Sequence, residues 1–247
     1  MSNVTFPTEV IDLPSGGKLY PEGHALKSGQ VELKYMTAKE EDILTSTNLI
    51  QKGVVLDKLI DSLVVTKGVT HEDFLLGDLN AVMVASRILG YGKDYPVNVT
   101  CPKCNTTVEH NVDLSQLETK EVLENDLTVQ LPVSGKTIKV KLLTRKIEKD
   151  IQKELDSLKK IGSNIEPDAT TRLRYIIAEV DGSKDHKVIR ETVENMLVKD
   201  AKALREFYKT VTPDVKFESI FICESCSEQT VLPFSIGLNF FWPDARV

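Results

Sequence analysis

The chain has 247 residues, of which 41% are hydrophobic and 28% are charged, and its formal net charge is −6. The acidic balance disfavours nucleic acid as a partner, because phosphate binding requires clustered Lys and Arg. No apolar run approaches the roughly 18 residues that a membrane-spanning helix needs, so we expect no membrane contact. The N-terminal stretch lacks the charged and apolar regions of a secretory signal, which favours a reducing compartment.

The first elements lie between residues 13 and 62. LPSGGKLY (13–20) predicts a glycine-containing turn, and VELKYM (31–36) predicts a strand. Thr37 and Glu40 have the spacing of a capping box, which predicts a helix that begins after Thr37. A charged, amphipathic helical stretch follows.

A second helix is predicted over DLNAVMVASRILGYG, which begins at residue 78. Asp78 is a suitable N-cap, because its carboxylate can accept the first free backbone N–H groups of a helix. Gly90 is expected to end the helix.

The first CxxC pair lies in VTCPKCNTTVEHNV (99–112), between two stretches of alternating polarity. These stretches predict a β-hairpin with Cys101 and Cys104 at its tip. Asn105 suits the left-handed conformation that the turn after the pair requires, and Ser227 in the later pair suits it less well. His110 is expected at a solvent-facing strand position rather than on a metal.

The second half repeats this order. LPVSGKTI (131–138) matches LPSGGKLY, and IKVKLLTRKIEK (138–149) matches VELKYMTAKEED. VSGKT resembles the end of a phosphate-binding loop, but Gln130 stands where that loop needs glycine and strand-like residues follow, so we predict a hairpin turn. Thr144 replaces Thr37 before a second charged helix, and Ile147 stands where a capping box needs Glu, which predicts a weaker cap.

The second CxxC pair, Cys223 and Cys226, is also flanked by alternating residues. Asp200 opens a helical stretch 23 residues before Cys223, and Asp78 lies 23 residues before Cys101. We therefore predict an α+β fold made by a tandem, pseudo-twofold duplication, with repeats at 8–114 and 127–236. Each repeat has a strand, helices and a β-hairpin. The alternative is a chance match of helices followed by strand pairs.

Four thiolates complete a tetrahedral metal site, whereas two do not. Cys101, Cys104, Cys223 and Cys226 are therefore predicted to bind one structural zinc ion per chain, in a zinc-ribbon-like site with four cysteine ligands. A redox CxxC pair would lie at a helix N-terminus after a strand, which does not fit these flanks. Four unligated thiols are the remaining alternative.

The C-terminal segment GLNFFWPDARV (237–247) lies outside both repeats. Phe240, Phe241 and Trp242 are candidate partner-binding residues, because aromatic side chains are common interface anchors. The alternative is that they fold back as a lid on the core.

No catalytic constellation is recognisable. The four histidines form no HExxH motif, no GxSxG is present, and no acidic pair stands out among 37 acidic residues. We expect no enzymatic activity and no small-molecule substrate.

Two segments, LPSGGKLY…VLDKLI (13–60) and RILGYGKDYPVNVTCPKC (87–104), resemble the T4-type bacteriophage baseplate protein family. The resemblance covers nearly the whole chain. It implies a non-enzymatic tail protein, either a baseplate hub component or a hub assembly factor, that contacts other phage tail proteins. It also implies a location in the host cytoplasm during assembly, or in the baseplate of the virion tail. A cellular zinc-ribbon adaptor that binds protein partners is the alternative.

Overall fold

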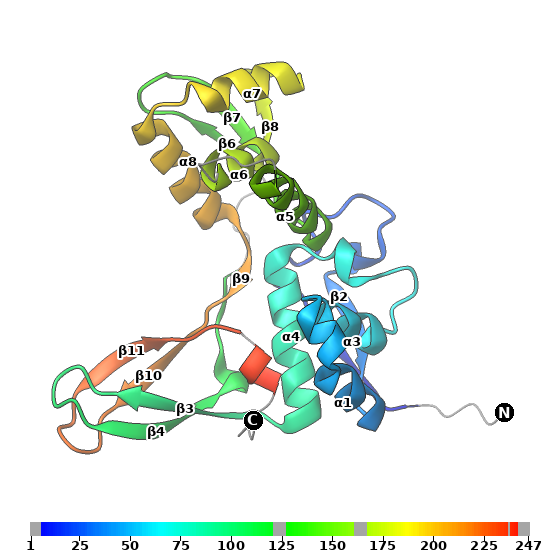
Figure 1. The fold of residues 1–247 in the computed structure, drawn as a ribbon, viewed down its shortest axis with the longest axis vertical. Coiled ribbons are helices and arrows are strands. Elements are labelled where there is room, and N and C mark those ends of the chain that lie inside the picture. Colours follow the sequence, from blue (N-terminus) through cyan, green and yellow to red (C-terminus); the bar gives the residue numbers. More distant parts are fainter. Residues whose placement is uncertain (1–5, 121–126, 161–166, 237, 242–247) are drawn as a thin grey trace. The chain divides into compact units, whose positions relative to one another are not determined.

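The computed structural model describes residues 6–120, 127–160, 167–236 and 238–241. The chain divides into two compact units, residues 1–70, 77–121 and 214–247 in unit 1 and residues 71–76 and 122–213 in unit 2. Both units contain helices and small antiparallel sheets, which confirms the α+β class (Figure 1). No helix in the described part of the chain combines the length and the apolar character that crossing a membrane requires.

Unit 1 begins with an antiparallel pair of strands, in which Val31 and Leu33 of the second strand are buried and Glu32 between them is exposed. The strands are β1 (Thr8–Asp12) and β2 (Gln30–Lys34), and the helices that follow are α1 (Ala38–Thr45), α2 (Thr47–Gln51), α3 (Val55–Leu63) and α4 (Leu76–Tyr91). The core of this unit joins α1, α3 and α4, through Leu44, Leu59 and Val84, with buried residues of later segments such as Val112 and Val215.

The predicted capping box is confirmed at the start of α1. The Thr37 side chain accepts from the helix, and Glu40 accepts a 2.9 Å hydrogen bond from the Thr37 backbone N–H. Burial raises the pKa of Glu40, but hydrogen bonds from Lys34, Ser62 and Thr37 outweigh it and hold the pKa at about 2. The cap is therefore also an ionic anchor between β2, α1 and α3.

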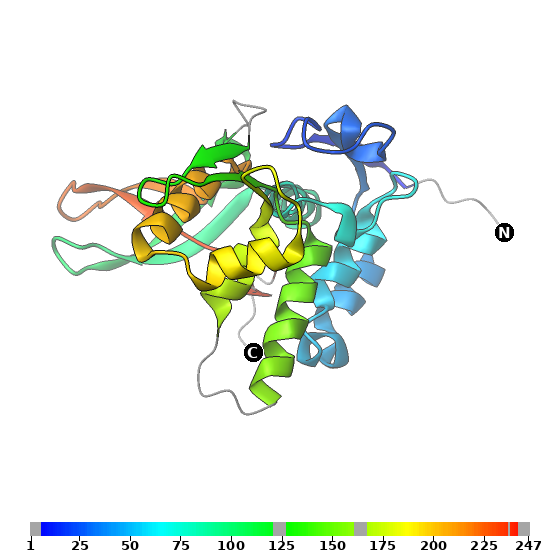
Figure 2. The same cartoon turned by 90° about the horizontal axis from the view of Figure 1, so that it is seen from above.

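Two β-hairpins complete unit 1. They are formed by β3 (Asp94–Thr100) with β4 (Thr107–Asp113) and by β10 (Glu218–Ile222) with β11 (Gln229–Pro233). They lie next to each other in both ribbon views (Figures 1 and 2). The short strands β5 (Thr119–Lys120) and β9 (Asp214–Val215) pair beside them.

Unit 2 has a three-stranded antiparallel sheet in the order β6-β7-β8. Its strands are β6 (Thr128–Gln130), β7 (Thr137–Val140) and β8 (Ile177–Val180), and its helices are α5 (Arg145–Lys160), α6 (Asp168–Ile176), α7 (His186–Glu194) and α8 (Val198–Val211). The VSGKT segment forms the β6–β7 turn, as predicted. Thr144 caps α5 through a 3.3 Å hydrogen bond from Ile147 N–H.

Two local predictions were wrong. Asp78 and Asp200 are not N-caps, because α4 begins at Leu76 and α8 begins at Val198, which makes each aspartate the third helical residue. The left-handed residue after α4 is Gly92, with φ of 84°, rather than Gly90.

The repeats at 8–114 and 127–236 do not coincide with the compact units, because the second hairpin belongs to unit 1. Repeat boundaries describe sequence correspondence and compact units describe packing, so the repeats stay a prediction.

Candidate metal centre

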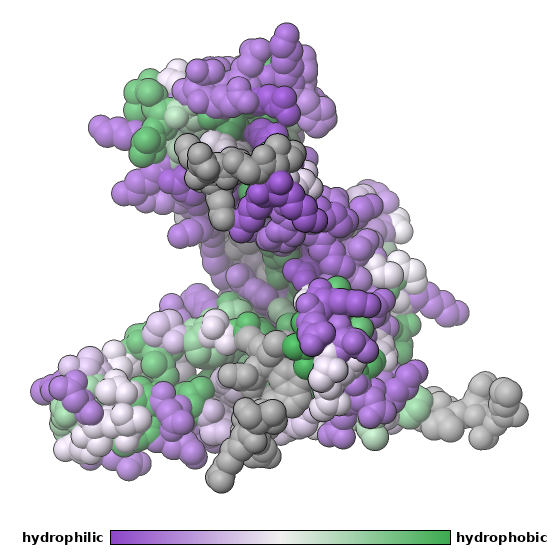
Figure 3. Space-filling model, viewed as in Figure 1, coloured by the Kyte–Doolittle hydropathy of each residue, from purple (hydrophilic) through white to green (hydrophobic). Residues whose placement is uncertain are grey.

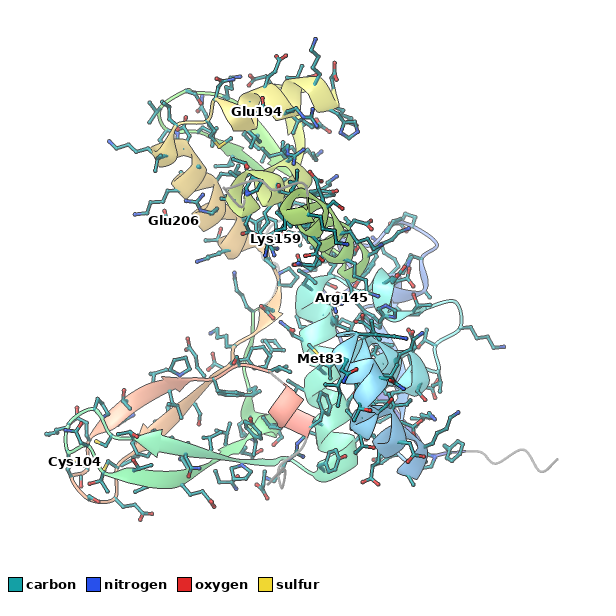
Figure 4. The ribbon with its side chains drawn as sticks, in the orientation of Figure 1. Met83, Cys104, Arg145, Lys159, Glu194 and Glu206 are labelled. Atoms are coloured by element: carbon teal, nitrogen blue, oxygen red, sulfur yellow. The ribbon has the colours of Figure 1, made fainter. Side chains whose placement is uncertain are left out.

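The four cysteines lie at the tips of the two hairpins in unit 1, and Figure 4 labels Cys104 there. Both tips have the same backbone pattern. Asn105 N–H donates to the Cys101 carbonyl at 3.0 Å, and Ser227 N–H donates to the Cys223 carbonyl at 2.8 Å. Asn105 and Ser227 have φ of 57° and 56°, the left-handed turn that the sequence required at both positions.

The sulfur atoms are close enough to share one ion. All four lie within 4.8 Å of one another, with Cys101 Sγ 3.7 Å from Cys226 Sγ and Cys104 Sγ 3.6 Å from Cys223 Sγ. Zinc with tetrahedral Zn–S bonds of about 2.3 Å places its sulfurs about 3.8 Å apart. The donor set and its spacing therefore fit a tetrahedral zinc ion.

The site is buried on one side and open on the other. Cys101 and Cys223 are 0% exposed and pack with Val99 and Phe221, whereas Cys104 is exposed. Across the tips, Lys103 forms a 2.8 Å ion pair with Glu228, and both side chains are exposed to solvent, so this pair adds little stability.

The thiols of the site differ in pKa. Hydrogen bonds with the Thr106 side chain and backbone lower the pKa of Cys104 to about 6. A hydrogen bond from the Glu228 backbone lowers the pKa of Cys226, but burial and three neighbouring thiols together raise it to about 12. Without a cation, a second thiolate in this cluster repels the first, so the four groups cannot all ionise near neutral pH.

The sequence profile of the family described as T4 bacteriophage base plate protein matches residues 6–242. The chain belongs to this family. Comparisons with curated proteins and with solved structures gave no match. Membership confirms the resemblance found in the sequence, and it makes the chain a structural protein of the phage baseplate, associated with the virion tail and with other phage structural proteins.

His110 of the baseplate protein is half-buried rather than solvent-facing as expected. Its Nε2 lies 3.1 Å from Ser219 Oγ of the other hairpin, and its ring packs edge-on against Phe221 at 5.4 Å between centroids. Residue spacing alone did not reveal this contact, because it depends on how the two hairpins pack.

The structure places two of the three predicted partner-binding aromatics in the core of unit 1. Phe240 and Phe241 are 0% exposed, and the Phe240 ring packs edge-on against Tyr95. Trp242 lies outside the described residues. The choice between lid and docking segment therefore stays open for Trp242, while the burial of Phe240 and Phe241 favours the lid for these two.

Sequence reasoning missed Arg87, which binds the backbone of the tail. Arg87 is 1% exposed, and its guanidinium donates to the carbonyls of Phe240, Gly92 and Asp94 at 3.0, 2.9 and 3.3 Å. Burial lowers the pKa of Arg87. An arginine on the apolar stretch ASRILGY was the available signal, because a buried charge requires partners.

Proposed function

We propose that this baseplate protein is a hub component or a hub assembly factor that acts through protein–protein contacts and carries one structural zinc ion. The observation that carries the proposal is the family match over residues 6–242. A hub component remains in purified virions, whereas an assembly factor is found only in infected cells. Quantitative mass spectrometry of purified virions and of infected cells separates the two roles. If the protein is absent from both while tails assemble normally, neither role holds.

The zinc part rests on the sulfur geometry. Cys104 and Cys223 are 119 residues apart in the chain, so an ion between them closes a long loop and would stabilise the folded state of unit 1. Elemental analysis of protein purified without chelator should give one zinc per chain. A value well below one contradicts the proposal.

Zinc removal should have a global effect on unit 1. Cys223→Ser should weaken zinc binding and also expose the segment near Cys101 to proteases, because both hairpins share the ion. Ser225→Ala, at the same hairpin tip but not a ligand, is the matched control. Equal protease resistance of Cys223→Ser and wild type would mean that packing alone holds the hairpins together.

We also propose that residues 8–114 and 127–236 arose by duplication. Support comes from the shared order of turn, strand, helices and CxxC hairpin, and from the aspartate at the third position of α4 and of α8. A superposition of the two repeats in which the hairpins match but β2 and β7 do not would reduce the proposal to a zinc ribbon with a long insertion.

For the tail we propose that Trp242 contributes to partner contact. Trp242→Ala should fold, keep its metal and fail to complement tail assembly, since losing an interface anchor costs about 2 kcal/mol or more. Phe241→Ala is the matched control, because it opens a core cavity and should lower the free energy of unfolding by about 3–5 kcal/mol. Full complementation of tail assembly by Trp242→Ala would show that Trp242 does not contribute to the partner contact.

A further inference from the structure

The outer faces of the two hairpins differ in polarity. Ile220, Ile222 and Val231 of the second hairpin are 61%, 59% and 58% exposed. Ile220 and Val231 are direct cross-strand neighbours. We call these three residues the outer strip.

The first hairpin shows which residues this outer position accepts. Counted from the cysteines, the counterparts of the outer strip are Asn98, Thr100 and Glu109, and Asn98 pairs with Glu109 as Ile220 pairs with Val231. The hairpin fold around the cysteines is therefore compatible with polar residues here. Single exposed apolar residues are common, but a cross-strand apolar cluster marks a contact surface.

A groove of about 460 Å³ adjoins the outer strip, with Ile220 and Val231 in its lining. Its other walls come from residues 110–113 of β4, from residues 116–118, and from residues 216, 218 and 219 around the start of β10. β4 and β10 each hydrogen-bond to one neighbouring strand within the described residues, and residues 110–113 and 218–220 of these strands line the groove. A groove lined by strands and apolar side chains suits an extended polypeptide. Figure 3 shows hydrophobic residues interspersed with polar ones over the hairpins.

The charged side chains that line the groove indicate which kind of partner segment can bind there. Its lining holds the carboxylates of Asp113, Glu118 and Glu218 and the ammonium of Lys216. Lys93 binds Asp113 at 2.7 Å and holds its pKa at about 2, and Lys216 lowers the pKa of Glu118. Both carboxylates are therefore ionised at neutral pH, but each is already paired with a lysine, Asp113 with Lys93 and Glu118 with Lys216, at 2.7 Å. With these two ammonium groups counted, the three carboxylates leave one excess negative charge, which favours an occupant with a cationic side chain.

We propose that the outer strip and this groove bind an extended segment of a partner protein that carries apolar side chains beside lysine or arginine. The proposal deepens the proposed action through protein contacts and rests on it. A second copy of this chain fits less well, because its net charge of −6 and its own acidic groove oppose self-association.

The test uses the full chain and two short synthetic peptides. One peptide alternates valine with lysine, and the other alternates valine with glutamate. NMR titration should place the amide shifts of the lysine peptide at residues 110–113 and 218–222, and the glutamate peptide should bind at least about tenfold more weakly.

Variants then separate the surface from the fold. The triple variant Ile220→Asn, Ile222→Thr and Val231→Gln copies the polar residues of the first hairpin, with glutamine as the uncharged form of Glu109. It should keep the wild-type metal content and lose at least about tenfold in affinity for the lysine peptide, because apolar contact area is removed. Asn98→Ser with Thr100→Ser, on the first hairpin, is the matched control and should bind as wild type does. Ile220→Asn alone serves if the triple variant does not fold.

Equal binding by variant and wild type, equal binding of the two peptides, or no binding of either overturns the proposal. A wild-type dimer in sedimentation that the triple variant converts to monomer also overturns it, in favour of a second copy. Complementation of tail assembly by the triple variant overturns only this surface and leaves the proposed function standing. Absence of the protein from both virions and infected cells affects the proposed function instead.

Discussion

Asp78 and Asp200 occupy matching places in two parts of the chain, and each anchors a turn that starts with Leu-Pro. Asp78 accepts hydrogen bonds from Ser15 N–H, Ser15 Oγ and Tyr20 hydroxyl at 2.9, 2.7 and 2.8 Å. Asp200 accepts from Val133 N–H and Ser134 N–H at 2.8 and 3.0 Å. We call this contact between a helix carboxylate and a Leu-Pro turn the clamp. Both carboxylates are almost fully buried, at 0% and 1% exposed, but Asp78 also accepts from the hydroxyl groups of Ser15 and Tyr20.

The difference lies in the segment that follows each turn. After the first turn, residues 18–29 intervene before β2, and Tyr20 of this segment donates its hydroxyl to Asp78. After the second turn, β7 begins at Thr137. Burial outweighs the hydrogen bonds from Ser15 and Tyr20 and raises the pKa of Asp78, whereas at Asp200 burial also acts but the hydrogen bonds from Val133 and Ser134 outweigh it and lower the pKa. The pKa of the clamp carboxylate is therefore raised at Asp78 and lowered at Asp200.

Removal of the carboxylate should give the largest effect. Asp78→Ala leaves three buried donors without an acceptor and should lower the free energy of unfolding by roughly 3–5 kcal/mol. Asp200→Ala should cost clearly less, because the freed amides of Val133 and Ser134 belong to exposed residues that water can reach. Urea unfolding of both variants measures the difference. Equal losses in the free energy of unfolding would show that the different surroundings of the two carboxylates do not affect their contribution to stability.

The second test compares Gly17 with Gly135, the fifth residues of the two turns, which have φ of 72° and 70°. A Cβ on Gly17 would lie 2.3 Å from the Lys27 carbonyl oxygen, whereas a Cβ on Gly135 meets nothing within 4 Å. Gly17→Ala should therefore cost about 2–4 kcal/mol from strain plus overpacking. Gly135→Ala should cost about 1–2 kcal/mol from the left-handed backbone alone. Thermal unfolding distinguishes the two variants. If Gly135→Ala loses as much stability as Gly17→Ala, the close contact at Gly17 does not add to the cost.

Tyr20→Phe removes one of the three donors to Asp78 and should lower the free energy of unfolding by about 1 kcal/mol. Tyr35→Phe is the matched control, because the Tyr35 hydroxyl bonds Glu9 at an exposed site and its loss should be close to zero. A double-mutant cycle of Tyr20→Phe with Asp78→Asn should show coupling. Additive losses would mean that the hydroxyl acts independently of the carboxylate.

The smallest expected effect is in the pH dependence. The raised pKa of Asp78 means that its contribution to stability is greatest below the unfolded pKa of about 3.9 and falls as pH rises through the folded pKa. The lowered pKa of Asp200 means that its contribution is present above about 3.9 and is lost as pH falls through the folded pKa. Relative to wild type, Asp78→Asn should therefore lose more stability at acid pH than at neutral pH, and Asp200→Asn should lose less. Denaturation between about pH 3 and 7 measures the stability of both variants relative to wild type. If this difference changes with pH in the same direction for Asp78→Asn and Asp200→Asn, the predicted opposite pKa shifts are wrong.

Much of the candidate metal centre could be predicted from the sequence. The two CxxC hairpins, the left-handed turns at Asn105 and Ser227 and the capping box at Thr37 all follow from residues a few positions apart. Such features depend on backbone preference and on hydrogen bonds within one turn, so neighbouring residues determine them.

Other features depended on tertiary structure. The helix-borne carboxylates bind turns 63 and 66 residues away, and Arg87 binds a carbonyl 153 residues away. The second hairpin packs into unit 1 beside the first, which turns His110 toward Phe221 and leaves the outer strip exposed. Local sequence sets which groups can bind, but burial and the packing of distant segments select their partners and decide whether the pKa of a charged group is raised or lowered. Only the assembled fold brings those segments together.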